Sequence, residues 1–293
     1  MFLEGKVHKI KSNFYYVQTR EGLYTCKARG KLKSKGRILV GDLVTITPDR
    51  NLTGVIEEIK PRKNELTRPP VANLDQVIVF LAARQPDINC YMLDKLLVQI
   101  EAKNLPSVIC INKMDLSSPQ EMEDIVSVYC GAGYKVILMS LVTKEGLSDL
   151  IDILHDKTTV LAGPSGTGKS SFINSIRQGY SLQTGAVSKK TGRGRHTTRH
   201  VELLPLKEGK GEIVDTPGFS RLEISHISSQ ELPWLFPEIK RLMGQCKFSS
   251  CLHKAEPGCC VKEELARGSI SPRRYENYLQ ILEEIQEKER NFI

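Results

Sequence analysis

The first part of the chain alternates between apolar and polar residues in short runs. A period of two, which predicts half-buried strands, recurs over residues 5–11, 14–20, 23–29, 42–47 and 54–60. Turn-forming pairs such as Ser12-Asn13 and Glu21-Gly22 separate these runs. Five short strands without helical periodicity predict a small closed β-barrel.

Beyond Thr67-Arg68-Pro69-Pro70, which breaks the pattern, apolar strands alternate with amphipathic helices. We expect strands at residues 76–82, 107–111, 135–140, 158–162 and 211–214, and helices at 89–103, 119–130, 147–154 and 171–176. This alternation predicts a mostly parallel α/β sheet with helices on both faces. A further amphipathic helix at 271–290 belongs to a last part that we expect to be mostly α-helical, so the fold class is multidomain.

The expected strand at 158–162 runs directly into a glycine-rich loop. Its sequence, Gly163-Pro164-Ser165-Gly166-Thr167-Gly168-Lys169-Ser170-Ser171, contains the pattern G-x-x-x-x-G-K-[ST] between a strand and a helix. Glycines allow successive backbone N–H groups to point at phosphate oxygens. Lys169 would reach the β- and γ-phosphates, and the Ser170 hydroxyl would bind Mg²⁺. The alternative is a Gly/Ser turn that precedes a helix and binds nothing.

Asn112-Lys113-Met114-Asp115 follows the strand expected at 107–111 and has the N-K-x-D pattern with which G proteins read guanine. Asp115 would accept two hydrogen bonds from the guanine edge; adenine lacks both donors, which argues against an ATPase. Asn112 would tie this loop to the phosphate loop, and the stem of Lys113 would lie along the base. In G proteins, a Ser-Ala loop at the end of the next strand usually touches the guanine oxygen. Ser140 lies at the corresponding place in this sequence, but the residue after it is Leu141 and not alanine.

Two further segments are candidates for sensing the γ-phosphate. Residues 188–200 are basic and glycine-rich, and Thr198 or Thr197 would cap Mg²⁺ from there; we take Thr198. The alternative is a plain basic surface loop. The strand expected at 211–214 ends in D-x-x-G, in which Asp215 would hold the Mg²⁺ shell through water and the N–H of Gly218 would meet the γ-phosphate.

The order of these motifs differs from that of ordinary G domains, in which the phosphate loop precedes N-K-x-D. Here N-K-x-D and the serine loop come first, so the sequence predicts a circularly permuted P-loop GTPase domain. One consequence is that the D-x-x-G segment, the second of the two candidate γ-phosphate sensors, runs straight into the C-terminal region. We therefore hypothesise that nucleotide state is passed directly to that region.

Near the C-terminus, three thiols and one imidazole lie close together in the sequence, as Cys246, Cys251, His253 and Cys259. A Cys₃His set forms the closed tetrahedron of a structural zinc ion. Cys260 is an alternative ligand, and free thiols on a loop are the alternative to a metal site.

Charge and composition narrow the class of protein. Residues 1–70 hold 15 Lys and Arg against 7 Asp and Glu, an excess equal to the net charge of +8 of the whole chain. A basic N-terminal part predicts a polyanionic partner, the alternative being a solvated basic surface. No apolar run approaches the ~20 residues of a membrane span and no secretory leader is visible, so we expect no membrane association, a cytoplasmic protein and cysteines that bind metal rather than form disulfides.

Together these features resemble the circularly permuted GTPases that depend on the small ribosomal subunit, known as RsgA or YjeQ. The resemblance rests on residues 112–115, 163–171, 192–198 and 215–219 and on the Cys₃His set. It implies an OB-fold RNA-binding domain over residues 1–64, a linker over 65–72, the GTPase domain over 73–222 and a zinc-binding domain over 223–293. It also implies a bacterial factor that binds GTP and GDP, the small ribosomal subunit and its rRNA, and assists late maturation of that subunit. We expect a monomer.

Hydrolysis of GTP needs a water in line with the leaving phosphate, and many G proteins orient it with a Gln directly after D-x-x-G. Here that residue is Phe219, so we expect slow intrinsic hydrolysis that the ribosome stimulates. His196 is the candidate catalytic residue, because an imidazole can position water or relay a proton near neutral pH. The alternative is that His196 contacts rRNA or nothing.

Two other functions would share most of these motifs. One is an RNA-binding chaperone in which GTP only times release. The other is a GTP-regulated RNA-modification enzyme, for which the sequence contains no second catalytic constellation.

Overall fold

The computed structural model describes residues 2–33, 36–67, 69–176, 201–206, 211–215 and 227–291, without the side chains of Lys31, Lys33, Ile176 and Asp215. The chain divides into two compact units, and each is described by itself. Unit 1 comprises Met1–Val77, Ile151–Ala162 and Lys169–Phe219; unit 2 comprises Ile78–Leu150, Gly163–Gly168 and Ser220–Ile293. Within the described residues, every helix is too short or too polar to cross a membrane.

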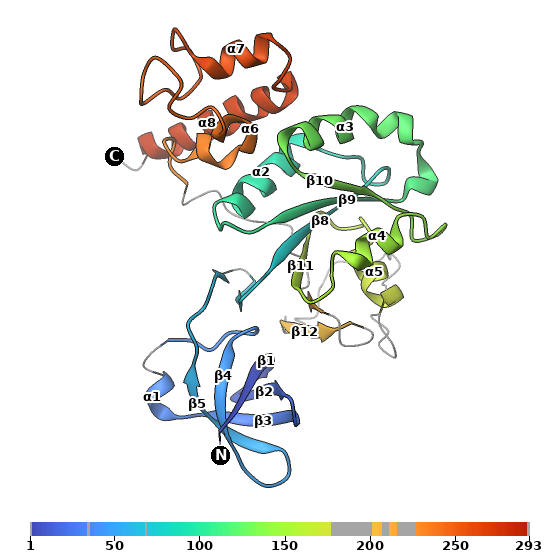
Figure 1. Cartoon of the computed structure of the whole chain (residues 1–293), viewed down its shortest axis with the longest axis vertical. Coiled ribbons are helices and arrows are strands. Elements are labelled where there is room, and N and C mark those ends of the chain that lie inside the picture. Colours follow the sequence, from blue (N-terminus) through green and yellow to red (C-terminus); the bar gives the residue numbers. More distant parts are fainter. Residues whose placement is uncertain are drawn as a thin grey trace. The chain divides into compact units, whose positions relative to one another are not determined.

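Unit 1 begins with the closed five-stranded barrel that the sequence predicts (blue in Figure 1). Its strands are β1 (Leu3–Lys11), β2 (Phe14–Thr19), β3 (Gly22–Ala28), β4 (Leu43–Pro48) and β5 (Thr53–Ile59). They are ordered β1-β2-β3-β5-β4, and β4 pairs back with β1 to close the barrel. Alternate apolar side chains, including Val7, Val17, Cys26, Ile46 and Ile56, are fully buried in its interior.

The basic segment between β3 and β4 differs from a plain loop because it begins with a short helix, α1 (Gly30–Lys33). Leu32 is the reason, since this apolar side chain is buried against the barrel core amid basic neighbours. A single turn of helix allows Leu32 to point inward.

The remainder of unit 1 continues the barrel sheet. β11 (Thr158–Ala162) pairs in parallel with β13 (Glu212–Asp215), and β12 (Glu202–Pro205) pairs antiparallel with β13. β12 also meets β1, where Lys9 lies opposite Glu202. Among its described residues, unit 1 also contains α5 (Lys169–Ile176) and the short hairpin of β6 (Glu65–Leu66) and β7 (Val71–Ala72).

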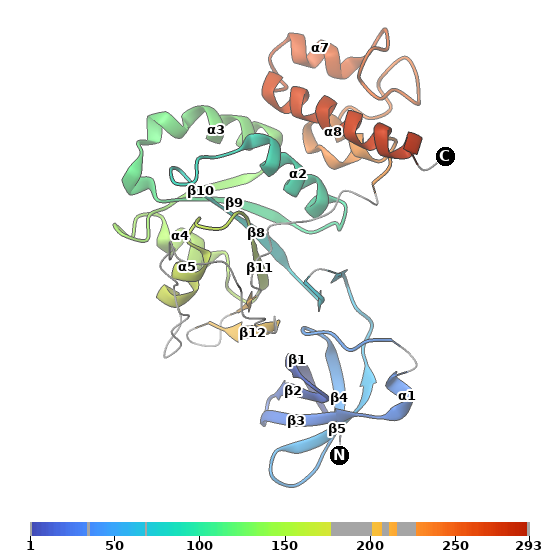
Figure 2. The same ribbon diagram turned by 180° about the vertical axis from the view of Figure 1, so that it is seen from behind.

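Unit 2 contains a second group of strands, ordered β10-β9-β8. They are β8 (Gln76–Ala82), of which the first two residues belong to unit 1, β9 (Ser107–Asn112) and β10 (Lys135–Leu138). Both views place α2 (Cys90–Glu101) and α3 (Pro119–Ala132) on one side of these strands (Figures 1 and 2). The side chains of Asn89 and Ser118 cap the two helices, which therefore begin where the sequence changes from polar to periodic. α4 (Leu147–Asp152) and the 3₁₀ turn η1 (Met114–Leu116) follow β10 and β9 respectively.

The C-terminal part of unit 2 is helical, as expected. It contains η3 (Leu232–Leu235), α6 (Pro237–Lys240), α7 (Cys260–Ala266) and the long α8 (Pro272–Asn291). One face of α8 buries Tyr278, Ile281, Leu282 and Ile285 in a core that also contains Phe236. The apolar stripe of the sequence therefore packs within the chain.

Candidate functional site

The glycine-rich loop, residues 163–168, is built around backbone that only glycine tolerates. Gly163 has φ +124°, and a Cβ there would lie 2.1 Å from the carbonyl oxygen of Phe80. Gly168 has φ +99°, and its Cβ would lie 2.2 Å from the Asn112 side-chain nitrogen. The glycines of the pattern are therefore required by close approach of neighbouring groups.

The segment that we expect to read guanine, residues 112–115, is tied to this loop within unit 2. Asn112 is buried at the end of β9, and its amide Nδ2 donates to the carbonyl of Thr167 at 2.9 Å. The Thr167 hydroxyl in turn donates to the carbonyl of Pro164 at 3.0 Å. These bonds hold the two loops in one arrangement.

Asp115 is exposed, and its carboxylate is fixed from one side by Ser140. The fully buried Ser140 hydroxyl donates to Asp115 Oδ1 at 2.5 Å and accepts the N–H groups of Val142 and Thr143 at 3.1 and 3.2 Å. A carboxylate held in this way is pre-oriented for two donors on a planar base.

Lys113 adopts the left-handed conformation, with φ 64°, and its ammonium donates to the backbone carbonyl of Gln85. Sequence reasoning missed Gln85. The segment after β8 borders both loops, because a Cβ on Gly166 would lie 3.6 Å from Pro86. Pro86, a turn residue four positions after the last residue of β8, was a signal for this segment though not for the contact of Gln85, since ligands of parallel sheets bind at the carboxyl ends of strands.

Lys169 and Ser170 open α5, which continues the chain from the glycine-rich loop. Burial lowers the pKa of the Lys169 ammonium to about 8. Ser170 and Ser171 are exposed in the first helical turn. Of the other expected nucleotide and Mg²⁺ residues, His196, Thr197, Thr198 and Gly218 lie outside the described residues, as does the side chain of Asp215.

The four expected metal ligands meet in unit 2. The ligand atoms of Cys246, Cys251, His253 and Cys259 all lie within 4.8 Å of one another. The Nδ1 atom of His253 is 3.5, 3.5 and 3.4 Å from the Sγ atoms of Cys246, Cys251 and Cys259. A tetrahedral zinc ion with ordinary bond lengths would separate these atoms by about 3.6 Å, so the donor set fits such an ion. The Cys260 Sγ, 3.1 Å from that of Cys246, is not part of this four-residue group.

The loop that carries His253 is held by its neighbours. The hydroxyls of Tyr275 and Tyr278 on α8 donate to the carbonyls of His253 and Leu252, each at 2.6 Å. The carboxylate of Glu256 accepts the N–H groups of Leu252, Lys254 and Ala255. The loop is thus preorganised around the imidazole.

Comparison with known proteins agrees with this geometry. The family model described as RsgA GTPase matches residues 59–225, and the RsgA N-terminal domain model matches residues 4–56. A "Small ribosomal subunit biogenesis GTPase RsgA" from Caldanaerobacter subterraneus subsp. tengcongensis is 46% identical, over 98% of this chain and 97% of the relative. A protein of the same name from Geobacillus thermodenitrificans is also 46% identical, over 97% of this chain and 98% of that one.

Solved structures are similar over the same length. A crystal structure of YloQ, described as a circularly permuted GTPase, has a TM-score of 0.83 and 38% identity, covering 98% of this chain and 96% of its own. That of YjeQ from Thermotoga maritima has a TM-score of 0.86 and 38% identity, covering 98% of this chain and 99% of its own.

Proposed function

Because the chain belongs to the RsgA GTPase family, we propose that it hydrolyses GTP and assists late maturation of the small ribosomal subunit. The observation that carries the nucleotide part is the bond between Asn112 and Thr167, which joins a guanine-reading loop to a phosphate loop. The ribosomal part is supported by the names of full-length relatives and by the basic N-terminal part of the chain.

In this proposal, GTP lies against the ends of the two loops. Asp115 accepts the guanine donors, Lys113 lies along the base, and Ser140 holds Asp115 in place. The residues that bind GTP are Asn112, Lys113, Met114, Asp115, Ser140, Gly163, Pro164, Ser165, Gly166, Thr167, Gly168, Lys169, Ser170, Ser171 and Gly218. The ammonium of Lys169 supplies positive charge to the phosphates.

A Mg²⁺ ion bound with the nucleotide would supply positive charge at its phosphates. We assign Ser170, Thr198 and Asp215 to its coordination sphere, with Asp215 acting through water. The backbone of Asp215 ends β13, as the D-x-x-G motif requires.

We propose His196 as the residue that positions the attacking water, because Phe219 cannot do so. Replacement His196→Ala should remove most of the stimulated turnover and leave GTP affinity intact. Stimulated turnover equal to that of the wild type would remove His196 from the mechanism.

The Cys₃His group is proposed to hold one structural zinc ion through Cys246, Cys251, His253 and Cys259. Because all four positions of the tetrahedron would be filled by protein, the ion would stabilise the fold and take no part in hydrolysis.

For the whole chain, we propose an OB-fold RNA-binding domain over residues 1–64, a linker over 65–72, the permuted GTPase domain over 73–222 and the zinc-binding domain over 223–293. The barrel would bind rRNA of the small subunit through its basic surface. We propose a monomer that works in the cytoplasm, where ribosomes assemble.

GTP turnover by the purified protein, measured with and without small ribosomal subunits, tests the proposed function. Large subunits and bulk RNA are the controls. We expect low intrinsic turnover and strong stimulation by small subunits alone. Equal stimulation by any RNA, or no stimulation, would refute the ribosomal part.

Base specificity tests the nucleotide part separately. Asp115→Asn removes the acceptor of the guanine donors and should weaken GTP binding while leaving the already weak binding of ATP unchanged. Loss of ATP binding in this variant would instead indicate an ATPase.

A further inference from the structure

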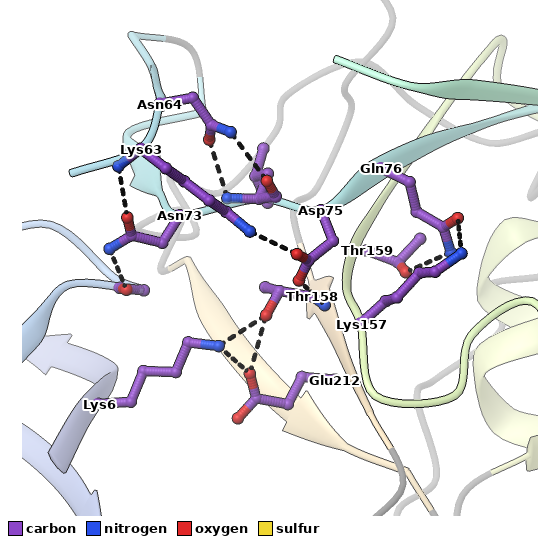
Figure 3. A network of polar contacts seen from close by, with 12 residues as sticks. Lys6, Lys63, Asn64, Asn73, Asp75, Gln76, Lys157, Thr158, Thr159 and Glu212 are labelled. Carbon is purple, nitrogen blue, oxygen red and sulfur yellow. Dashed lines mark hydrogen bonds and ion pairs between the residues drawn. The ribbon is translucent and has the colours of Figure 1, made fainter.

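A cluster of charged side chains in unit 1 joins the barrel to the strands β11 and β13 (Figure 3). Lys6 of β1 reaches the first residue of each strand: its Nζ lies 2.6 Å from the Thr158 hydroxyl and 2.6 Å from a carboxylate oxygen of Glu212. The His8 Nε2 lies 2.8 Å from the other carboxylate oxygen of Glu212. We call Lys6, His8, Thr158 and Glu212 the barrel clamp.

An irregularity in β1 places a further basic side chain beside the barrel clamp. The register of β1 against β2 shifts between Val7 and Lys9, so the strand carries one extra residue there. Val7 points into the barrel core, and after the shift Ile10 takes the next inward position. Lys9 therefore turns outward and pairs with Glu202, the first residue of β12, at 2.8 Å. Lys6 and His8 share the outward side of β1 by ordinary alternation about the buried Val7, and the bulge adds Lys9 to that side.

Glu212 is the centre of the barrel clamp, with a side chain only 18% exposed. Burial alone would raise its pKa, but the hydrogen bond from His8 and the charge of Lys6 outweigh burial and hold the pKa at about 2. The carboxylate is therefore ionised throughout the physiological range. Removing it would leave His8 without its carboxylate partner and Lys6 with the Thr158 hydroxyl in place of an anion.

A second set of bonds holds the start of β11 from the other side (Figure 3). Asp75 pairs with Lys63, which follows β5, and its other carboxylate oxygen accepts the N–H of Thr158 at 2.7 Å. Gln76 donates to the Thr159 hydroxyl at 3.0 Å. The barrel and residues 63–76, which follow it in the chain, therefore hold the first residues of β11 in place.

The two strands held in this way end at residues of the candidate nucleotide site. β11 ends at Ala162, directly before the glycine-rich loop, and β13 ends at Asp215 of D-x-x-G. β11 has 5 residues and β13 has 4. The length of an extended strand along its axis barely changes. A displacement of the start of β13 is therefore carried to Asp215.

We propose that Glu212 is a positioning residue for GTP hydrolysis, which through Lys6 and His8 transmits the engagement of the barrel by RNA to Asp215. This inference rests on the proposed function, because it concerns the turnover that small subunits stimulate. Glu212 touches neither nucleotide nor RNA in this role. Its contribution is measured by the ratio of stimulated to intrinsic GTP turnover.

The barrel supplies a matched control. A cavity of about 560 Å³ is lined by Lys6, Lys60 and Glu212 among other residues. Lys60 pairs with Glu4 of the barrel at 3.3 Å, whereas Lys6 pairs with Glu212 of β13. Lys6→Met and Lys60→Met remove the same charge from the same cavity, so both should weaken attraction to RNA. Only Lys6→Met breaks the barrel clamp.

The test measures GTP turnover at saturating small subunits, relative to turnover of the same variant alone. Glu212→Gln and Lys6→Met should each lower this ratio about tenfold, within the usual range of coupling between two sites. Lys60→Met should lower subunit affinity and leave the ratio at saturation unchanged, and Lys6→Arg should keep most of the ratio. The double variant Lys6→Met/Glu212→Gln should lose no more than the worse single variant.

A second readout distinguishes transmission from mere structural support. Hydrogen exchange of the β13 amides should change on binding of small subunits in the wild type and stay unchanged in Glu212→Gln. Melting curves check that each variant is folded, and His8→Gln replaces Glu212→Gln if the latter does not fold. The inference would be wrong, and the proposed function untouched, if the ratios of Glu212→Gln and Lys6→Met stayed within twofold of wild type. The same would follow if Lys60→Met lowered the ratio as much as Lys6→Met does. Absence of stimulation in the wild type would overturn the proposed function and the inference with it.

Discussion

At the scale of single residues, the pKa of Lys169 is the property of the phosphate loop that can be tested without a ribosome. Burial lowers this pKa to about 8, so the ammonium is charged below pH 8 and loses its proton above it. Bound phosphates favour the charged form and raise the pKa in the complex. GTP affinity should therefore be constant below pH 8 and fall by up to about tenfold per pH unit above it.

Calorimetry at pH 8.5 in buffers of different ionisation heat measures this effect as proton uptake on binding. Lys169→Arg is the control, because guanidinium remains charged and should bind without proton uptake. Binding by the wild type with no proton uptake at pH 8.5 would contradict the assignment.

Ser140 has a partner that the sequence did not suggest. The Ser-Ala comparison predicts contact with guanine, which stays a prediction, and in the structure the Ser140 hydroxyl donates to Asp115. Ser140→Ala should lower GTP affinity roughly tenfold, the usual effect of losing a hydrogen bond to a charged group. Isothermal titration measures the affinity. Ser117→Ala removes a hydroxyl that donates to Glu121 at 2.6 Å, and should leave GTP affinity unchanged.

The site was readable from the sequence where chemistry depends on residue type at fixed spacing. The phosphate loop, N-K-x-D and the metal ligands have that property. The contacts of Gln85 and Glu212 were not readable. The first acts through a backbone carbonyl, which any residue provides, and the second acts through partners 204 and 206 residues away in the chain.

At the scale of elements, the apolar pattern predicted those with regular burial along their whole length, on one face in the barrel strands and α8 and on both faces in β8. The strands of the barrel, β8 and α8 begin and end within a few residues of their expected positions. β12 was missed, because its four residues Glu202–Pro205 have no period of their own and are strand only through pairing with β13 and β1. The short helices α1, α6 and α7 were missed for the same reason, since packing rather than propensity stabilises them.

The helix α8 is also fixed to α2 and α6 by a buried charge cluster. The guanidinium of Arg274 donates to Asp94 at 2.5 Å and to both carboxylate oxygens of Glu238 at 2.7 and 2.9 Å. It also lies 4.7 Å from the ring centre of Phe236. Arg274, Asp94 and Glu238 are 2%, 0% and 6% exposed, so neither carboxylate has access to water as a substitute partner.

Arg274→Met should therefore destabilise the protein by about 3–5 kcal/mol, because it leaves two buried carboxylates without their cation. Urea unfolding, followed by a signal from the C-terminal helices, measures the change. Arg273→Met is the control: Arg273 is exposed one position earlier on the same helix and should change stability by less than about 0.5 kcal/mol. Equal effects of the two substitutions would show that the charge cluster contributes nothing.

At the scale of the whole molecule, this cluster bears on how nucleotide state reaches the C-terminal part. The sequence suggested direct transmission, because the D-x-x-G segment leads into that part. The structure adds that the C-terminal helices are anchored to α2 and α3 of the same unit, through Arg274 and through Arg241, which donates to the carbonyl of Ala132 at 3.1 Å. A signal that moved these helices would have to break buried ionic contacts, so we expect the C-terminal part to move together with α2 and α3.

The proposed zinc ion would complete this part of unit 2, and the adjacent pair Cys259 and Cys260 allows a matched test of which thiol binds it. Cys259 belongs to the four-residue group, whereas Cys260 only lies beside Cys246. The wild type and Cys260→Ser should each contain one zinc ion per chain, and Cys259→Ser should contain none. Zinc release on denaturation, measured with a chromogenic chelator, gives the content.

Loss of the zinc ion should also loosen a defined part of the chain. Without zinc, the loop around His253 loses the group that draws its three thiols together, and the hydroxyls of Tyr275 and Tyr278 lose fixed acceptors. Amide hydrogen exchange should then rise over residues 246–260 and along α8, while β1 to β5 of unit 1 keep the protection of the wild type. Zinc retained by Cys259→Ser but lost by Cys260→Ser would instead make Cys260 the ligand. Faster exchange throughout the barrel would mean that the metal stabilises the whole chain and not one unit.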